Sequence, residues 1–185
     1  MNSFSLDEKI LNLEIATIPF RIRNMTGFFR NEINQLEEAY FTKGLFVCSL
    51  ILTIDEKFVF GKLSGKTFNN TKFDLIGGTL CKDENEINSG KDIFNSLYSE
   101  FVEEVNLLEE NIEDCTMIGA ILNENFQVGL IFFTKINLTS NELNDEFLEK
   151  NDGEMKALEF VSSDAIATFL TSFQGWKSSV SILIA

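Results

Sequence analysis

The sequence predicts a mixed α+β domain, an α/β/α sandwich in which a largely antiparallel or mixed sheet lies between helices. Short apolar, β-branched runs recur along the chain, and segments with helical spacing separate them. The alternation of the two is too irregular for a doubly wound parallel sheet. A length of 185 residues suits one domain. We divide residues 1–185 into an N-terminal strand and helix extension at 1–44, a core at 45–172 and a tail at 173–185.

The N-terminal extension is expected to contain one strand and one helix. The strand at 20–23 follows Pro19, the one proline of the chain. Thr26 is a plausible cap for a helix over 27–40, in which apolar residues recur at helical spacing.

The core begins with a predicted hairpin. The apolar run 45–54 is expected to form a buried strand, 55–57 a turn and 58–63 the partner strand. After a polar loop, residues 73–80 are expected to form a further strand that ends in a glycine-rich turn.

The rest of the core is expected to mix helices with strands. The best-marked helix covers 92–105, and another runs from Thr139 or Ser140 to about Lys150. A last helix starts over 164–170, and the apolar tail is expected to pack on the body. The strands of this part are expected at 116–122, 128–136 and 157–161.

Composition narrows the chemistry available to this chain. It has no histidine, which excludes His-based triads and His-ligated zinc. The net charge of −14 repels nucleic acids and anionic lipids, so neither a nucleic acid nor a membrane is an expected partner. The three cysteines are scattered, and the N-terminus lacks a signal-like apolar run. We therefore expect a cytoplasmic protein in which any catalysis comes from carboxylates, hydroxyls, thiols, Lys or Arg side chains, or a carboxylate-bound metal.

The predicted helix over 92–105 carries a group of carboxylates. At 3.6 residues per turn, Glu100, Glu103 and Glu104 share one face, while Phe101 and other apolar residues occupy a second face that can anchor the helix on the sheet. Carboxylates at this spacing repel one another, and a divalent cation removes that penalty. Mg²⁺ prefers such hard oxygen ligands. The alternative is an ordinary Glu-rich, solvated helix face.

The segment from Gly78 to Leu107 resembles the Nudix motif G-x5-E-x7-R-E-U-x-E-E-x-G-U, where U is apolar. Glu100 falls on the first Glu of the motif's helix, and Glu103 and Glu104 fall on its Glu pair. In Nudix hydrolases these glutamates ligate Mg²⁺ or Mn²⁺, and the metal polarises a diphosphate and activates a water. The resemblance therefore implies a Nudix fold with these three residues as catalytic metal ligands.

The motif also departs from the family pattern. Ser99 replaces the Arg whose ion pair usually holds a metal-ligand carboxylate, and Lys91 replaces the early Glu, with Asp92 one step on. The late Gly is Asn106, which also tolerates a left-handed conformation at a helix end. These departures leave open an inactive relative or a divergent branch.

A second resemblance favours a divergent branch, that of the UDP-glucose diphosphatases. It implies hydrolysis of UDP-glucose or UDP-galactose to UMP and a sugar 1-phosphate with Mg²⁺, and a small nucleoside diphosphate derivative as the partner. The matching pieces are short and lie at 20–22, 94–107, 118–123, 132–141 and 154–161.

Five residues are candidates for substrate binding. Arg21 and Arg23 are expected to contact phosphates or the base, although a solvated strand edge explains them equally well. Lys62 follows the hairpin, where Nudix enzymes often place a phosphate-binding cation; a surface lysine is the alternative. Asn123 sits at a strand end and suits a uracil or ribose contact or a turn. Gly78 belongs to the glycine turn.

The general base is expected at Glu154, with Glu159 as the second choice, because many Nudix enzymes carry a further acidic residue in this loop. Two other functions stay open: a Nudix hydrolase for ADP-ribose or another nucleotide, and a non-catalytic Nudix module that binds a nucleotide or a protein. The sequence does not specify the oligomeric state.

Overall fold

The computed structural model describes residues 3–7, 10–16, 44–63, 73–80, 87–122, 127–150 and 155–172. The elements up to the first long helix are β1 (Ser3–Asp7), β2 (Ile10–Glu14), β3 (Leu45–Leu52), β4 (Lys57–Leu63) and β5 (Phe73–Asp74). The rest are α3 (Gly90–Val105), the short η2 (Glu109–Asn111), β6 (Ile112–Leu122), β7 (Val128–Ile136), α4 (Ser140–Lys150), β8 (Met155–Ser162) and α5 (Ile166–Ser172).

The main sheet is mixed, as expected. Its strand order is β5-β4-β3-β7-β6, and β8 pairs with β4. The central pair β3 and β7 is parallel, whereas the other pairs are antiparallel. β3 and β7 are buried over most of their length, which explains why both appear in the sequence as nearly continuous apolar runs.

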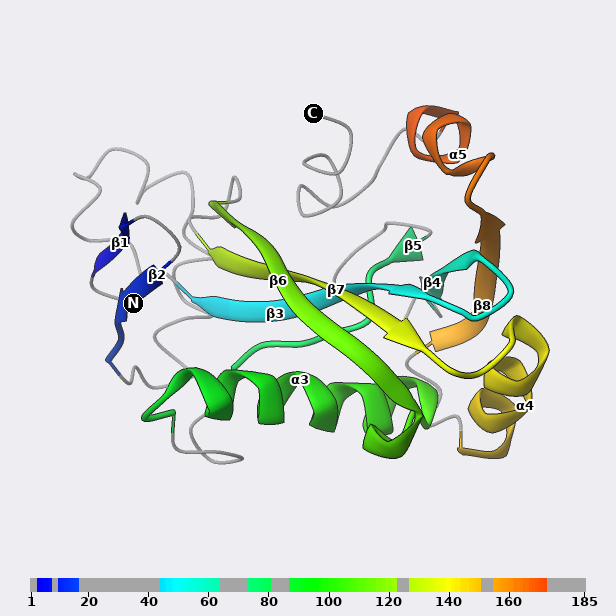
Figure 1. The fold of residues 1–185 in the computed structure, drawn as a ribbon, viewed down its shortest axis with the longest axis horizontal. Helices are drawn as coiled ribbons and strands as arrows, with labels where there is room; N and C mark the ends of the chain where they lie inside the picture. The colour runs from blue at the N-terminus through cyan, green and yellow to red at the C-terminus, as the bar shows by residue number, and fades with distance from the viewer. Residues whose placement is uncertain are drawn as a thin grey trace, which may run out of the picture.

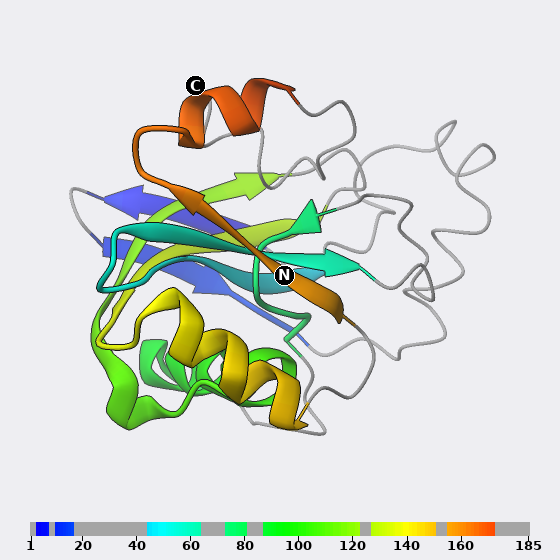
Figure 2. The same cartoon turned by 90° about the vertical axis from the view of Figure 1, so that its right-hand side faces the viewer.

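Helices cover both faces of this sheet, which confirms the predicted sandwich. Figure 2 shows α3 and α4 below the strands and α5 above them. One apolar cluster joins the sheet to α3 and α4 through residues such as Phe101, Phe132 and Phe147. A second cluster joins the other face to α5 through Phe60 and Leu170.

Most predicted elements are confirmed, with shifted ends. The helix predicted at 92–105 begins at Gly90, β7 has the predicted bounds, and β6 and β8 are longer than predicted. The strand predicted over 73–80 is wrong as a continuous element. Only Phe73–Asp74 form a strand, after which the segment touches β3 through two isolated bridges.

The N-terminal region contains a hairpin that the sequence did not reveal. β1 and β2 pair in antiparallel register as a separate sheet of two strands, labelled at the left of Figure 1. The strand predicted at 20–23, the helix at 27–40 and the tail at 173–185 lie outside the described residues.

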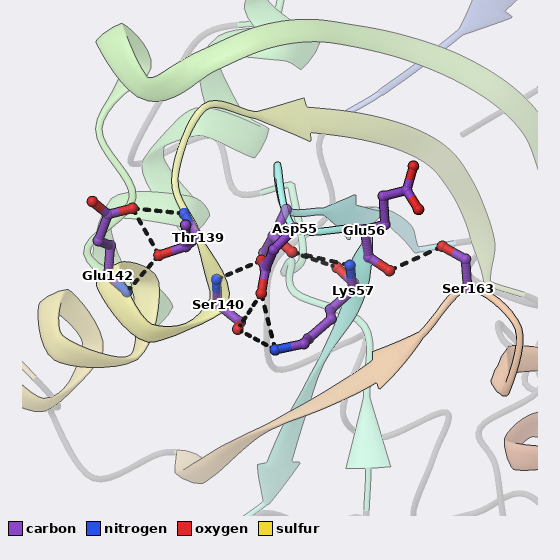
Figure 3. Close-up of polar contacts among 8 residues, drawn as sticks. Asp55, Glu56, Lys57, Thr139, Ser140, Glu142 and Ser163 are labelled. Carbon is purple, nitrogen blue, oxygen red and sulfur yellow. Dashed lines mark hydrogen bonds and ion pairs between the residues drawn. The ribbon is translucent and has the colours of Figure 1, made fainter.

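The start of α4 is fastened to the turn between β3 and β4. Asp55 accepts hydrogen bonds from the backbone and the hydroxyl of Ser140, both at 2.8 Å, and pairs with Lys57 at 2.9 Å (Figure 3). Thr139 and Glu142 exchange hydrogen bonds in a capping box, which confirms the predicted helix start. Ser140 is only 3% exposed, and through it this polar cluster holds α4 against the β3–β4 turn.

Within the described ranges, none of the helices is both long and apolar enough to cross a bilayer.

Candidate metal centre

Helix α3 is fixed at both ends and along one side. At its N-terminus the Asp92 carboxylate accepts hydrogen bonds from the backbone of Asn88 and from the backbone and hydroxyl of Ser89. At its C-terminus Asn106 adopts the left-handed conformation, with φ of 54°. Phe101 and its neighbours one turn away on the same side, Leu97 and Val105, are 0% exposed. This anchoring fixes the directions in which the glutamates leave the helix.

Glu104 points to the glycine turn that precedes the helix in sequence. Its Oε2 accepts a hydrogen bond of 2.8 Å from the backbone N–H of Gly77. Gly77 has φ of 149°, in a region that L side chains rarely adopt, and a Cβ there would lie 2.2 Å from the carbonyl oxygen of Val47. Position 77 therefore requires a glycine, because its backbone N–H faces the Glu104 carboxylate while its Cα faces the backbone of β3.

Glu100 lies over the next residue of the same turn. A Cβ added to Gly78 would fall 2.0 Å from Oε1, 2.3 Å from Cδ and 2.4 Å from Oε2 of Glu100. The carboxylate thus occupies the space that any side chain at position 78 would need. Glu100 and Glu104 are brought together at two consecutive glycines.

Glu103 is exposed and stands on the outer side of α3. It borders an open groove of about 360 Å³, lined also by Asn95, Tyr98, Ser99, Val102 and Glu109. In the part of the chain that the structure describes, no three Asp, Glu or Cys side chains form a ready-made metal cluster. The structure therefore brings two of the three predicted ligands together and leaves the third in solvent beside them.

The chemistry of these donors fits Mg²⁺. Mg²⁺ is commonly held by one or two carboxylates, with waters and substrate phosphates completing its shell. Glu100 and Glu104 supply such a pair at the edge of the helix–sheet contact, and Glu103 adds negative charge nearby.

The residues that depart from the motif have local roles. Ser99 donates its hydroxyl to the backbone carbonyl of Asn95, at 3.2 Å, within its own helix. Asp92, one residue after the position of the early Glu, belongs to the capping box at the start of α3, where it accepts hydrogen bonds from Ser89. Hydrogen bonds from Asn88 and from Ser89 lower the pKa of the Asp92 carboxyl.

Two of the other predicted site residues, Lys62 and Glu159, are described by the structure. The ammonium of Lys62 lies 5.8 Å from the centre of the Phe73 ring, and that ring packs against Phe169 of α5. Glu159 lies in β8 opposite Phe60 and is half-buried. Arg21, Arg23, Asn123 and Glu154 lie outside the described residues.

Sequence reasoning missed Gly77 as a hydrogen-bond donor to Glu104. The only available signal was the glycine pair itself, since a backbone N–H carries no side-chain signature. The motif assigns no role to Cys115. Burial raises the pKa of the Cys115 thiol, and the thiol is therefore a poor nucleophile.

Comparison with known proteins supports the fold. No family model matches the sequence, and no curated protein matches it. Solved structures do match. The NUDIX domain of Shewanella oneidensis NrtR, complexed with ADP ribose, has a TM-score of 0.55 at 11% identity, covering 83% of this chain and 93% of that one.

A second match is a NUDIX hydrolase from Nitrosomonas europaea, with a TM-score of 0.51 at 14% identity over 77% of this chain and 86% of that one. A third match is a bifunctional NMN adenylyltransferase/ADP ribose pyrophosphatase from Francisella tularensis. It has a TM-score of 0.54 at 11% identity and covers 89% of this chain and 45% of that one. The chain therefore has the Nudix fold.

Proposed function

We propose that this chain is a Mg²⁺-dependent hydrolase of the Nudix type that cleaves the diphosphate of a nucleoside-diphosphate-linked substrate. The observation that carries the proposal is the placement of Glu100 and Glu104 at the glycine turn of a Nudix fold. A helix that merely faced solvent would not need two carboxylates directed at consecutive glycines.

Each of the proposed site residues has its own role. Glu100 and Glu104 hold the cation, and Mn²⁺ is an alternative to Mg²⁺ in this donor set. A cation bound there supplies charge neutralisation for the diphosphate and a more acidic water. Glu103, exposed on the outer side of the same helix, is proposed as the third ligand. Glu154 remains the proposed general base, and Arg21, Arg23, Lys62 and Asn123 remain proposed contacts of the substrate.

Two substrate classes have separate support. Short sequence resemblances favour UDP-glucose or UDP-galactose. The bound ADP ribose of the similar NrtR domain favours ADP-ribose at least as strongly, because that ligand occupies a domain of the same fold. A non-catalytic nucleotide-binding or protein-binding module has the departures at Ser99 and Lys91 in its favour. The two retained carboxylates at the glycine turn favour a hydrolase instead.

A hydrolysis screen with and without Mg²⁺ tests the proposal. The substrates are UDP-sugars, ADP-ribose, dinucleotide polyphosphates and nucleoside triphosphates, and release of UMP or AMP identifies the nucleoside. Glu100→Gln, Glu103→Gln and Glu104→Gln are each expected to lower turnover about a hundredfold or more, since each removes a charged group from the reacting site. Glu149→Gln, an exposed glutamate of α4, is the matched control and should keep full activity.

The results of this screen distinguish a hydrolase from a non-catalytic binding module. Turnover that needs Mg²⁺ and is lost in the three variants supports a hydrolase. Binding of a nucleotide without turnover on any substrate supports the non-catalytic module and refutes the hydrolase.

A further inference from the structure

We infer that the Gly77–Gly78 turn is a positioning element for the metal-binding carboxylates. The inference rests on the proposed function, because it assigns the turn a task at the proposed metal site. Gly77 acts through its N–H group and Gly78 through the absence of a side chain.

The amide of Gly77 is a fixed donor. On either side of it, the backbone is bonded to β3: Ser49 donates to the carbonyl of Ile76 at 2.8 Å, and Val47 donates to the carbonyl of Gly78 at 2.9 Å. The Gly77 N–H therefore cannot turn away from Glu104 without breaking these bonds. A donor held in this way orients one carboxylate.

Gly78 sets the position of the second carboxylate. All three atoms of the Glu100 carboxyl group lie 2.4 Å or less from the place of a Cβ on residue 78. Contacts that short are not tolerated, so even an alanine would push the carboxylate aside. The bare backbone of Gly78 is what allows Glu100 to lie beside Glu104.

Ser99 is exposed, and its hydroxyl donates to the carbonyl of Asn95, so it does not contact the turn through that bond. The Gly77–Gly78 turn positions the two carboxylates from a neighbouring strand. A carboxylate placed by rigid backbone loses less conformational entropy on binding a cation than one placed by a long, flexible side chain.

The test measures binding of Mn²⁺ alone, followed by the electron paramagnetic resonance signal of the free ion, with no substrate present. Gly78→Ala is expected to weaken Mn²⁺ binding about 10- to 100-fold, the usual effect of disturbing a group that orients a metal ligand. Gly119→Ala is the matched control, because a Cβ at Gly119 would meet no atom within 4 Å. It should bind Mn²⁺ like the unaltered protein.

A double variant separates positioning from general damage. Glu100→Asp shortens the side chain by one methylene and withdraws the carboxylate from residue 78. If Gly78 acts by leaving room for Glu100, Gly78→Ala should add little further loss once Glu100→Asp is present. The two changes are then strongly non-additive, as expected for groups in direct contact. Thermal unfolding without metal shows which variants are folded.

Several results would overturn the inference: Mn²⁺ binding by Gly78→Ala equal to that of the unaltered protein, losses that simply add in the double variant, or failure of the double variant to fold. The last result would show that something other than Glu100 excludes a side chain at position 78. Failure of the unaltered protein to bind Mn²⁺ is a different result, because it refutes the proposed function itself.

Discussion

Asp55 illustrates how single residues fasten this fold. Partial burial would raise the pKa of its carboxyl, but hydrogen bonds from Lys57, Thr53 and Ser140 outweigh that effect and hold the pKa well below the usual 3.8. The carboxylate connects the β3–β4 turn to the first residue of α4, so its charged form is favoured by folding.

Asp55→Asn is therefore predicted to destabilise the protein in a pH-dependent way. Because the pKa is lowered in the folded state, the stabilising contribution is complete above the unfolded pKa near 3.8 and is lost as the pH falls below it. Near neutral pH the loss should be about 1 kcal/mol, since the pair is partly exposed. Urea unfolding of both proteins between pH 7 and pH 3 measures it, and a difference that grows towards acid pH would contradict this account.

The packing of helix α3 in the core determines the directions of the glutamates at the candidate site. Its buried stripe of Leu97, Phe101 and Val105 fixes the rotation of the helix, and that rotation decides where Glu100 and Glu104 point. The glutamates are thus positioned from two sides, by the apolar contact below and by the glycine turn beside them.

Phe101→Ala is predicted to lower the free energy of unfolding by about 3–5 kcal/mol, because a fully buried aromatic ring leaves a cavity. Chemical denaturation followed by circular dichroism gives the value. Leu148→Ala on α4 is the control: this side chain is 64% exposed, and its loss should change stability by less than about 0.5 kcal/mol. Equal effects of the two substitutions would show that α3 is not anchored through Phe101.

At the scale of the whole molecule, a net charge of −14 sets the electrostatic conditions. Such a charge repels itself in the compact state and repels a phosphorylated ligand. The proposed cation site lies within this negative field, which attracts divalent cations from bulk solvent. A cation bound there would reduce the repulsion that an anionic substrate meets.

Salt is predicted to stabilise the protein, with Mg²⁺ more effective than Na⁺ at equal ionic strength. Screening relieves the general repulsion, and each 1 kcal/mol so gained raises the Tm by roughly 2–4 °C for a chain of this size. Specific binding adds a further rise that grows with the Mg²⁺ concentration. Thermal unfolding in matched NaCl and MgCl₂ series measures both effects.

Two results would contradict this prediction. A Tm that is insensitive to NaCl would show that self-repulsion is unimportant. A Tm that responds equally to the two salts would show that no specific site is filled.

The local sequence pattern was sufficient to predict the elements that bury a regular run or stripe of apolar residues. The apolar run of β7 and the helical spacing of α3 follow from short-range periodicity, so both were predicted closely. The strand over 73–80 was wrong because the segment changes its partner, from β4 at Phe73–Asp74 to β3 at Ile76 and Thr79, and its apolar residues gave no sign of that change. β1 and β2 were missed although polar and apolar residues alternate over Ser3–Asp7, because each strand has only five residues and so gives a short periodic signal.

Four results follow from the sequence alone: the mixed fold, the helix that carries the glutamates, the exclusion of histidine chemistry and the three-glutamate hypothesis. The packing of the folded chain was needed to establish which carboxylates meet the glycine turn, that Glu103 stays in solvent, and that Lys62 lies over Phe73. Periodicity along one element is a local property of the chain, whereas the approach of a carboxylate to a backbone amide 27 residues away depends on how a helix and a strand pack together.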